Sequence, residues 1–321
     1  MPHLKALLNP KWLFWFVQKQ IRECRLRLQP NLRGAVWVPP GHYYSPLLDI
    51  QSLGPVEPIM PFDGVECWEH IDLRPSEQRS YYEDLLDRFP VLQFPSQKTD
   101  GYRFFTGQRW FELSDAFTLS GVIRKEKPRR IIEVGSGFSS AVMLDTLSYT
   151  GESATLTFIE PFPDRLHALL SSDDKSCSTI LVQRVQEVSL SIFDQLDARD
   201  VLFIDSSHVA KIGSDVTFIL LRILPRLKRG VLVHFHDIFY PFSYPVGWIR
   251  DGRAWNESIF LRAFLMRNPD FQIMAFNSFA GHSFPEVFRE RLPGFLNDTT
   301  GRFPADGSPV GGGSIWLRKV A

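Results

Sequence analysis

Four polar residues in the second half of the chain have types and positions that suit acid–base or metal chemistry. Asp205 directly follows a short apolar run and precedes His208 by three residues, and His236 and Asp237 directly follow a second apolar run. An imidazole titrates near neutrality, at a pKa of about 6.5, so His208 suits a general base. Asp205, Asp237 and His236 together suit a divalent cation such as Mg²⁺ or Mn²⁺. The same carboxylates also suit a structural role in which they bind water and cap helices, and both interpretations stay open.

A second set of residues surrounds a glycine turn. The apolar run 130–134 includes Glu133 and leads into two glycines separated by one residue, after which a helical pattern begins. Glycine allows the backbone to approach a ligand closely, and the start of a helix offers free N–H groups. The candidate ligand-binding residues of this turn are Glu133, Gly135, Ser136, Gly137 and Ser139. Glu160 follows the next apolar run, where one carboxylate can accept hydrogen bonds from both hydroxyls of a ribose.

Regular alternation of strands and helices is expected to position these residues. The pattern predicts strands over 130–134, 154–159, 179–183, 201–204 and 230–235, with helices over 138–149, 164–170, 189–196 and 212–227. Such alternation specifies a parallel sheet with right-handed crossovers, and ligands bind at the carboxyl ends of its strands. The last third departs from this repeat: we expect a helix over 256–266, a strand over 271–276, a loop over 278–312 and a final strand over 313–318.

Taken together, these motifs resemble a class I S-adenosylmethionine-dependent methyltransferase over about residues 120–320. The resemblance rests on Glu133-x-Gly135-x-Gly137-x-Ser139-Ser140, on Glu160, and on the stretch from Phe203 to His208. It is greatest for the bacterial branch that methylates oxygen of small molecules and sugars, the type 24-like methyltransferases. The resemblance implies an α/β fold with a Rossmann-like, seven-stranded, mostly parallel sheet, helices on both faces and an antiparallel last strand.

The resemblance also implies roles for individual residues. Glu133, Gly135 and Gly137, with the neighbouring serines Ser136 and Ser139, would line the methionine part of S-adenosylmethionine. Glu160 would bind the ribose, Gln186 the adenine, and Asp205 would lie beside the cofactor. By the same resemblance, Asp205 and Asp237 would hold Mg²⁺ or Mn²⁺, which would lower the pKa of an acceptor hydroxyl, with His208 as general base.

The sequence departs from the family pattern at three places, which keep alternatives open. Ser139 stands where the family often has a third glycine, and Asp237 is followed by isoleucine where the catechol branch has asparagine. His236 stands where the sugar branch has an acidic residue, so a metal-independent enzyme that uses His208 alone is an alternative. An NAD(P)-dependent oxidoreductase is disfavoured because Ser140 occupies the third position of its glycine fingerprint. A cofactor-binding scaffold without transfer activity is a further alternative.

Composition excludes several classes of protein. The 321 residues are 44% hydrophobic and 22% charged, with 36 basic and 36 acidic residues, so no overall field favours nucleic acid. Three scattered cysteines, without a CxxC pair, favour reduced thiols and a cytoplasmic location. We expect a small-molecule or saccharide acceptor as the partner, and the sequence does not indicate an oligomeric state.

The first 112 residues are predicted to form an extension in front of a methyltransferase domain at 113–321. A basic, aromatic helix is expected within 1–28, and its apolar run, 12–17, is too short to span a bilayer. This helix suits either packing on the domain or peripheral contact with the inner membrane surface. A proline-rich segment covers 30–75, and helices are predicted over 76–89 and 114–124. The aromatic segment 99–111 is a candidate lid. Tyr240, Tyr244, Trp248 and Arg250 are candidates for stacking on an acceptor or, equally, for packing.

Overall fold

The computed structural model describes residues 44–47, 70–296 and 311–321. The chain divides into two compact units, Met1–Pro55 and Val56–Ala321, and the second contains the sheet. The predicted basic helix over 1–28 and most of the proline-rich segment lie outside the described residues. The functional boundary at residue 112 stays a prediction.

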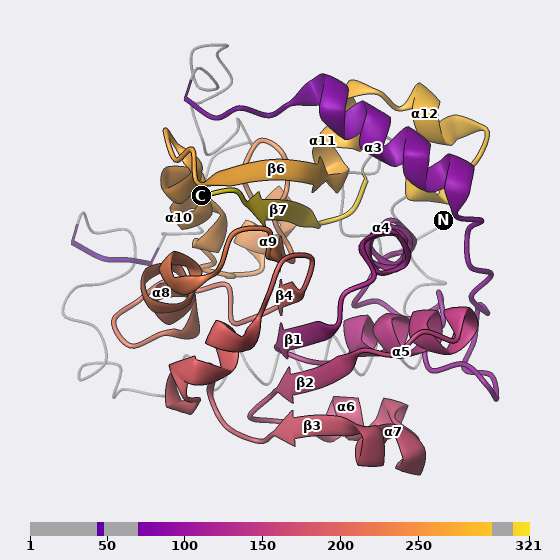
Figure 1. Ribbon diagram of the computed structural model, residues 1–321. Helices are drawn as coiled ribbons and strands as arrows, with labels where there is room; N and C mark the ends of the chain where they lie inside the picture. Colours follow the sequence, from indigo (N-terminus) through magenta and orange to yellow (C-terminus); the bar gives the residue numbers. More distant parts are fainter. Residues whose placement is uncertain (1–43, 48–69, 297–310) are drawn as a thin grey trace, which may run out of the picture. The chain divides into compact units, whose positions relative to one another are not determined.

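The sheet of the second unit has seven strands in the order β3-β2-β1-β4-β5-β7-β6 (Figure 1). The first five strands are parallel, and β7 pairs antiparallel with both β5 and β6. The expected sheet with an antiparallel last strand is therefore confirmed. Its strands are β1 (Arg130–Val134), β2 (Thr155–Ile159), β3 (Ser178–Leu181), β4 (Val201–Ile204), β5 (Leu232–Phe235), β6 (Phe271–Phe276) and β7 (Ile315–Lys319).

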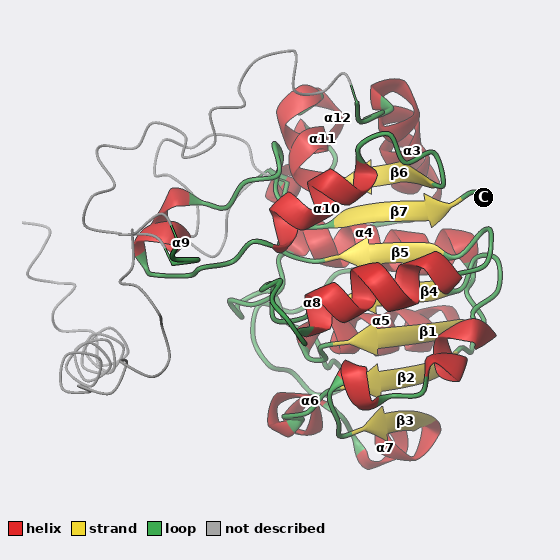
Figure 2. Cartoon of the chain, turned by 90° about the vertical axis from the view of Figure 1, so that its left-hand side faces the viewer, coloured by secondary structure: helices red, strands yellow, loops and turns green. Residues whose placement is uncertain are grey.

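Helices cover both faces of this sheet, so the side chains of its central strands are buried on both sides and are mostly apolar. Helices α4 (Leu113–Glu126) and α5 (Phe138–Thr150) lie on one face, with α3 (Pro75–Arg88) beside β6, whereas α8 (Asp215–Phe218) and α10 (Glu257–Leu265) lie on the other (Figure 2). Every residue of β4 and β5 is buried, because a parallel strand covered on both sides has no solvent face.

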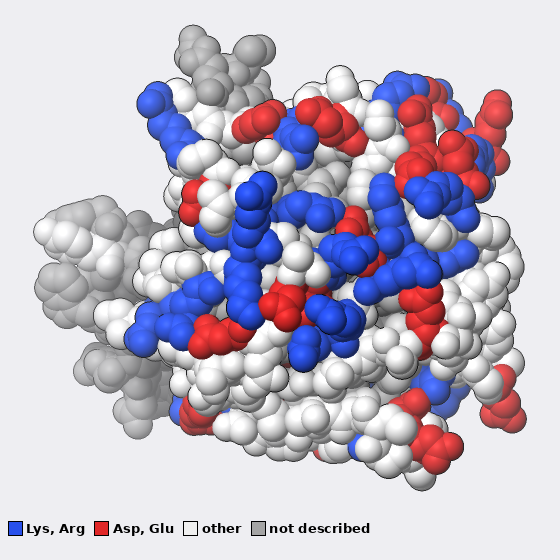
Figure 3. Space-filling view, viewed as in Figure 1, with Lys and Arg blue, Asp and Glu red and all other residues white. Residues whose placement is uncertain are grey.

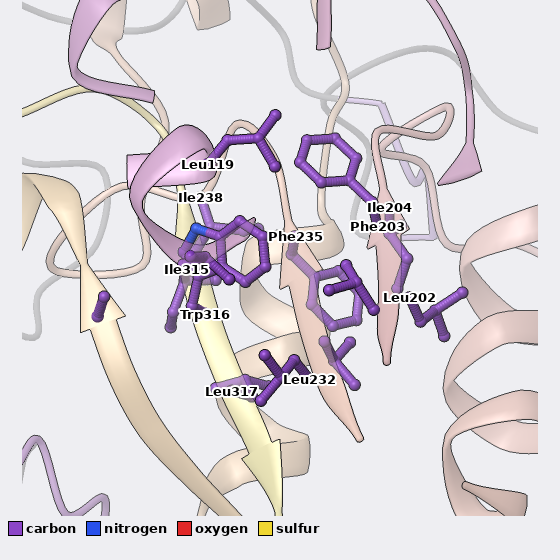
Figure 4. Close-up of a cluster of buried hydrophobic side chains, with 14 of the residues drawn as sticks. Leu119, Leu202, Phe203, Ile204, Leu232, Phe235, Ile238, Ile315, Trp316 and Leu317 are labelled. Carbon is purple, nitrogen blue, oxygen red and sulfur yellow. The ribbon is translucent and has the colours of Figure 1, made fainter. Parts of the chain in front are cut away.

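The core between β4, β5, β7 and α4 is built from large side chains (Figure 4). Phe203, Phe235 and Trp316 are fully buried, and Leu119 reaches them from α4. Full burial of each such side chain contributes on the order of 2 kcal/mol, so this cluster fixes the strands that carry the candidate site.

Several predicted elements differ from the structure. The helix expected over 212–227 is three pieces: α8, a π-helical turn (Ile219–Ile223) and a 3₁₀ turn (Leu224–Arg226), because Pro225 cannot continue an α-helix. The helix expected over 189–196 is a 3₁₀ turn, Leu190–Gln195. The prediction of a loop over 278–312 is wrong for the first part of this range, where the chain forms α11 (Asn277–Ser283) and α12 (Glu286–Arg289).

Three further short helices complete the fold. Helix α6 (Asp164–Leu169) was predicted, whereas α7 (Ser172–Cys177) and α9 (Val246–Arg250) were not. Helix α3 begins at Pro75 after a left-handed Arg74, one residue before the predicted start at 76. In the part of the chain that the structure describes, no helix is both long enough and apolar enough to cross a membrane.

Lysine and arginine side chains crowd the middle of the face that is turned to the viewer in Figure 1 (Figure 3). Acidic side chains lie among them on the same face. This face therefore carries mixed rather than purely positive charge.

Candidate functional site

The glycine turn and the end of β4 touch through their backbones. Gly135 has a φ of +81°, and a Cβ atom on it would lie 1.7 Å from the carbonyl oxygen of Asp205. The Asp205 N–H donates to the carbonyl of Val134 at 2.8 Å. Two features therefore require glycine at position 135: its positive φ, and the close approach of the Asp205 carbonyl, which leaves no space for a Cβ atom. The structure brings the predicted cofactor loop and the predicted catalytic aspartate together as expected.

Glu133 is fully buried beneath the turn and holds the start of α5. Its carboxyl accepts hydrogen bonds from the hydroxyls of Ser139, at 2.5 Å, and Ser140. Burial raises the pKa of Glu133 to about 8, and the bonds from the serines only partly oppose that rise. A serine in place of the family's third glycine therefore has a structural use, since Ser139 satisfies a buried carboxyl.

Glu160 lies directly after β2 and is fixed by two backbone donors. Its carboxylate accepts from the N–H of Ser136 at 3.1 Å and from that of Phe162 at 2.8 Å. Because a carboxylate offers about four acceptor positions, lone pairs remain for two hydroxyls of a ligand. The ring of Phe162 is 82% exposed beside it, an aromatic face that the sequence analysis did not single out. Gln186 lies farther along this edge and donates to the carbonyl of Gly213 at 2.9 Å.

His208 is buried among three carboxylates. Its Nε2 lies 3.4 Å from Asp205 and 3.7 Å from Asp237, and its Nδ1 lies 2.9 Å from Glu257. Burial alone lowers the pKa of an imidazole, but the bonds to Asp205 and Glu257 and the charge of Asp237 more than offset it. The pKa of His208 therefore lies well above its usual value. Three of the four residues that the sequence analysis grouped, Asp205, His208 and Asp237, thus lie together in space.

Sequence reasoning missed Glu257. It is the first residue of α10, is 1% exposed, and lies 49 residues away from His208 in the chain. The only signal in the sequence was an acidic residue in the first turn of a predicted helix, which the helix dipole explains equally well.

His236 lies beside Asp237 but does not complete a cation site in this arrangement. Its Nε2 is 3.6 Å from Asp237, and its ring packs 5.0 Å from that of Phe111. Among the described residues, no group of three or more His, Cys, Asp or Glu side chains is placed to hold a metal ion. The space between Asp205 and Asp237 is instead filled by the imidazole of His208. His234 is a core residue, stacked on Phe203 and bonded to Ser314.

The aromatic segment after β5 packs against His208 through Trp255, which was not among the stacking candidates named from the sequence. Trp255 lies against the His208 ring with 4.3 Å between centroids. Trp248 is 3% exposed and packs on Trp255, which leaves little of its ring for a ligand. Tyr240 packs on Phe279 and neighbouring rings.

The remaining two stacking candidates, Tyr244 and Arg250, differ in their surroundings. The hydroxyl of Tyr244 accepts from the N–H of Ser258 at 3.1 Å. Arg250 is exposed at the end of α9.

The candidate lid, residues 99–111, is anchored at its base. Arg103 donates to Asp174 at 2.6 and 2.8 Å and to Asp145 at 2.9 Å, both of which are buried. At the other end, the Trp110 ring lies 4.1 Å from the guanidinium of Arg165, whose side chain passes over Gly137. This segment therefore borders the glycine turn.

Comparison with known proteins agrees with this arrangement. Residues 132–238 match a family model described as a methyltransferase domain. A relative from Archaeoglobus fulgidus, described only as an uncharacterized protein, is 28% identical over 166 residues, which are 50% of this chain and 73% of that protein.

Three solved structures of methyltransferases show weaker similarity. The SAH-bound methyltransferase PaMTH1 of Podospora anserina is 16% identical with a TM-score of 0.39, covering 83% of this chain and 100% of that chain. The O-methyltransferase TomG of Streptomyces achromogenes with SAM is 14% identical with a TM-score of 0.39, covering 66% and 82%. A CmcI structure with Mg and SAM is 17% identical with a TM-score of 0.33, covering 70% and 82%.

The family match, the strand order and the glycine turn at the first strand all lead to one identification. The chain contains a methyltransferase domain, which the family model matches over residues 132–238.

Proposed function

We propose that this enzyme transfers the methyl group to a hydroxyl oxygen of a small molecule or saccharide, with His208 as the general base. The observation that carries this proposal is the position of the His208 Nε2, 3.4 Å from Asp205 at the carboxyl end of β4. That end of the strand is in backbone contact with Gly135, so the imidazole lies next to the loop that we assign to the cofactor.

Each residue has a defined task in this proposal. Glu160 binds the ribose hydroxyls, and Phe162 offers its exposed ring to the adenine. Glu133, Gly135, Ser136, Gly137 and Ser139 form the turn at the methionine end, and Gln186 borders the adenine end. Bound S-adenosylmethionine supplies an electrophilic methyl group on a positively charged sulfur. Placing the acceptor oxygen in line with it and excluding water supply most of the rate advantage.

His208 completes the transfer by accepting the proton of the acceptor hydroxyl on Nε2. In the ligand-free protein its raised pKa favours the imidazolium. Positive charge bound beside Asp205 disfavours that charged form, so His208 loses its proton more readily when the cofactor loop is filled. Trp255 shields one side of the ring from water.

A divalent cation at Asp205 and Asp237, with His236, is a second candidate feature. The observation in its favour is that both ring nitrogens of the buried His236 make no hydrogen bond among the described residues. The residues do not fit a cation as they are arranged, because the His208 ring occupies the space between the carboxylates. We therefore route no step through a metal.

Isothermal titration with S-adenosylmethionine tests the cofactor site. We expect Glu160→Ala to weaken binding at least about tenfold, since two hydrogen bonds to a charged group are lost. Glu152→Ala, which removes an ion pair with Lys127 at the other end of the strands, should bind normally. Equal affinity of both variants would contradict the assignment of Glu160.

The same titration, run with Mg²⁺ or Mn²⁺ after chelator treatment, tests the cation. A metal-binding heat that disappears in Asp205→Ala and Asp237→Ala would support it. Its absence in the wild-type protein would favour the metal-independent reaction.

Location and membrane contact are also proposals. The exposed free thiol of Cys177 is consistent with the reducing cytoplasm. Contact of residues 1–28 with an anionic membrane surface is supported by their basic and aromatic composition alone. Cosedimentation with anionic vesicles, with and without residues 1–28, tests it, and equal sedimentation would contradict it.

A further inference from the structure

We infer that Glu257 is a positioning residue that fixes the orientation and tautomer of His208. The inference rests on the proposed role of His208 as general base. Glu257 is 1% exposed, and its Oε2 lies 2.9 Å from the His208 Nδ1. A carboxylate at this distance accepts a hydrogen bond, so Nδ1 carries the proton and the lone pair of neutral His208 is on Nε2.

The start of α10 also holds the backbone of His208. The N–H groups of Asn256 and Glu257 donate to the His208 carbonyl at 3.0 and 3.2 Å. The side chain of Asn256 binds both the N–H and the carbonyl of Ala210. His208 has a left-handed φ of 59°, which an L-residue seldom adopts without such support. One helix terminus thus fixes both the ring and the main chain of this residue.

The geometry favours a positioning role over a merely structural one. A buried carboxylate is costly unless its oxygens are bonded, and the Oε1 of Glu257 has no hydrogen-bond partner among the described residues. Packing alone would be served as well by an apolar side chain of this size. Four residues surround the His208 ring from three places in the fold: Asp205 after β4, Asp237 after β5, and Trp255 and Glu257 at the start of α10. Among the described residues only Glu257 contacts Nδ1, so it selects the tautomer in which Nδ1 carries the proton and Nε2 keeps its lone pair.

Nitrogen NMR of the full-length protein tests this without a known acceptor. With ¹⁵N-labelled histidine, the signal of His208 is assigned by its loss in His208→Asn and observed at alkaline pH, where the ring is neutral. We expect wild-type protein to show the Nδ1–H tautomer. In Glu257→Gln, whose amide can also donate to Nδ1, the Nε2–H form should become the major species. The matched control is Glu286→Gln on α12, an exposed residue paired with Arg79.

An Nε2–H tautomer in the wild-type protein, or an unchanged tautomer in Glu257→Gln, would overturn the inference. A purely structural role would lower the melting temperature of the variant and leave the tautomer as it is. If Glu257→Gln fails to fold, the wild-type tautomer alone decides.

A kinetic cycle with catechol as acceptor probe gives a second readout. Glu257→Gln should lower kcat about 100-fold while the affinity for S-adenosylmethionine stays within about twofold, since general-base assistance contributes factors of this size. In a His208→Ala background, the same change should alter kcat less than about twofold, because Glu257 acts through His208. An equal loss in both backgrounds would contradict the inference. If wild-type protein does not methylate catechol, that result counts against the acceptor class of the proposed function, and the NMR result still decides Glu257.

Discussion

Replacement of Glu133 by glutamine should stabilise the protein, although it removes a residue from the centre of the site. The carboxyl is fully buried and has a pKa of about 8 in the folded protein, against an ordinary value of 4.5. At neutral pH the folded state keeps this proton, whereas the unfolded state has lost it. Stability from this group is therefore complete below pH 4.5 and decreases as the pH rises towards 8, after which the loss is constant.

The size of the effect follows from these two pKa values. Each pH unit between them is worth about 1.4 kcal/mol, so the loss reaches about 3 kcal/mol at pH 7 and about 5 kcal/mol above pH 8. Glutamine has the same shape, and its amide can accept from one serine hydroxyl and donate to the other. It does not ionise. The free energy of unfolding of Glu133→Gln should thus exceed that of wild type by up to about 3 kcal/mol at pH 7.

Urea denaturation followed by tryptophan fluorescence at pH 5, 7 and 8.5 measures this difference. We expect the gain in Glu133→Gln to increase with pH, while Glu286→Gln shows no such trend. A gain that does not change between pH 5 and 8.5 would refute the reasoning, because it would mean that the buried carboxyl does not hold a proton in the folded state.

Two further substitutions test the glycine turn and the ion pairs of Arg103. Gly135→Ala should abolish cofactor binding in calorimetry, since its Cβ would collide with the carbonyl of Asp205; Gly151→Ala, also at positive φ but in open space, should cost about 1 kcal/mol and bind normally. Normal binding by Gly135→Ala would show that the loop does not need this contact. Arg103→Met should lower the free energy of unfolding by about 3 kcal/mol, because it leaves two buried carboxylates without their partner, whereas the exposed pair of Arg88 should contribute under 1 kcal/mol. Similar losses in Arg103→Met and Arg88→Met in urea denaturation would contradict this.

The central strands could be predicted from the sequence because their signals are local. The bounds of β1, β4 and β6 agree with the predicted ranges, since each is a short, mostly apolar run with polar residues or glycine next to it. The short helices α11 and α12 could not be found, because one or two turns between prolines and glycines show no clear period.

The candidate site was predictable only where topology decides it. Residues at the ends of adjacent parallel strands must be neighbours, and Asp205 and Asp237 do meet at His208. The pairing of Glu257 with His208 depends on where α10 returns to the sheet, which no short-range pattern encodes. Likewise, Trp255 rather than Trp248 contacts the His208 ring because of the way in which the loop after β5 packs, and the sequence does not encode this locally.

The backbone around the site has a consequence for attempts to make this enzyme more heat-tolerant. Gly135, His208 and Asp237 all have left-handed φ angles, at the ends of three adjacent strands. Residues with a side chain carry a cost of about 1 kcal/mol in this conformation, which glycine avoids. At position 208 the side chain outweighs this cost, because glycine there would leave the buried carboxylate of Glu257 without its partner and would lower the melting temperature. Replacement of left-handed residues by glycine, a general route to heat tolerance, should therefore leave His208 unchanged.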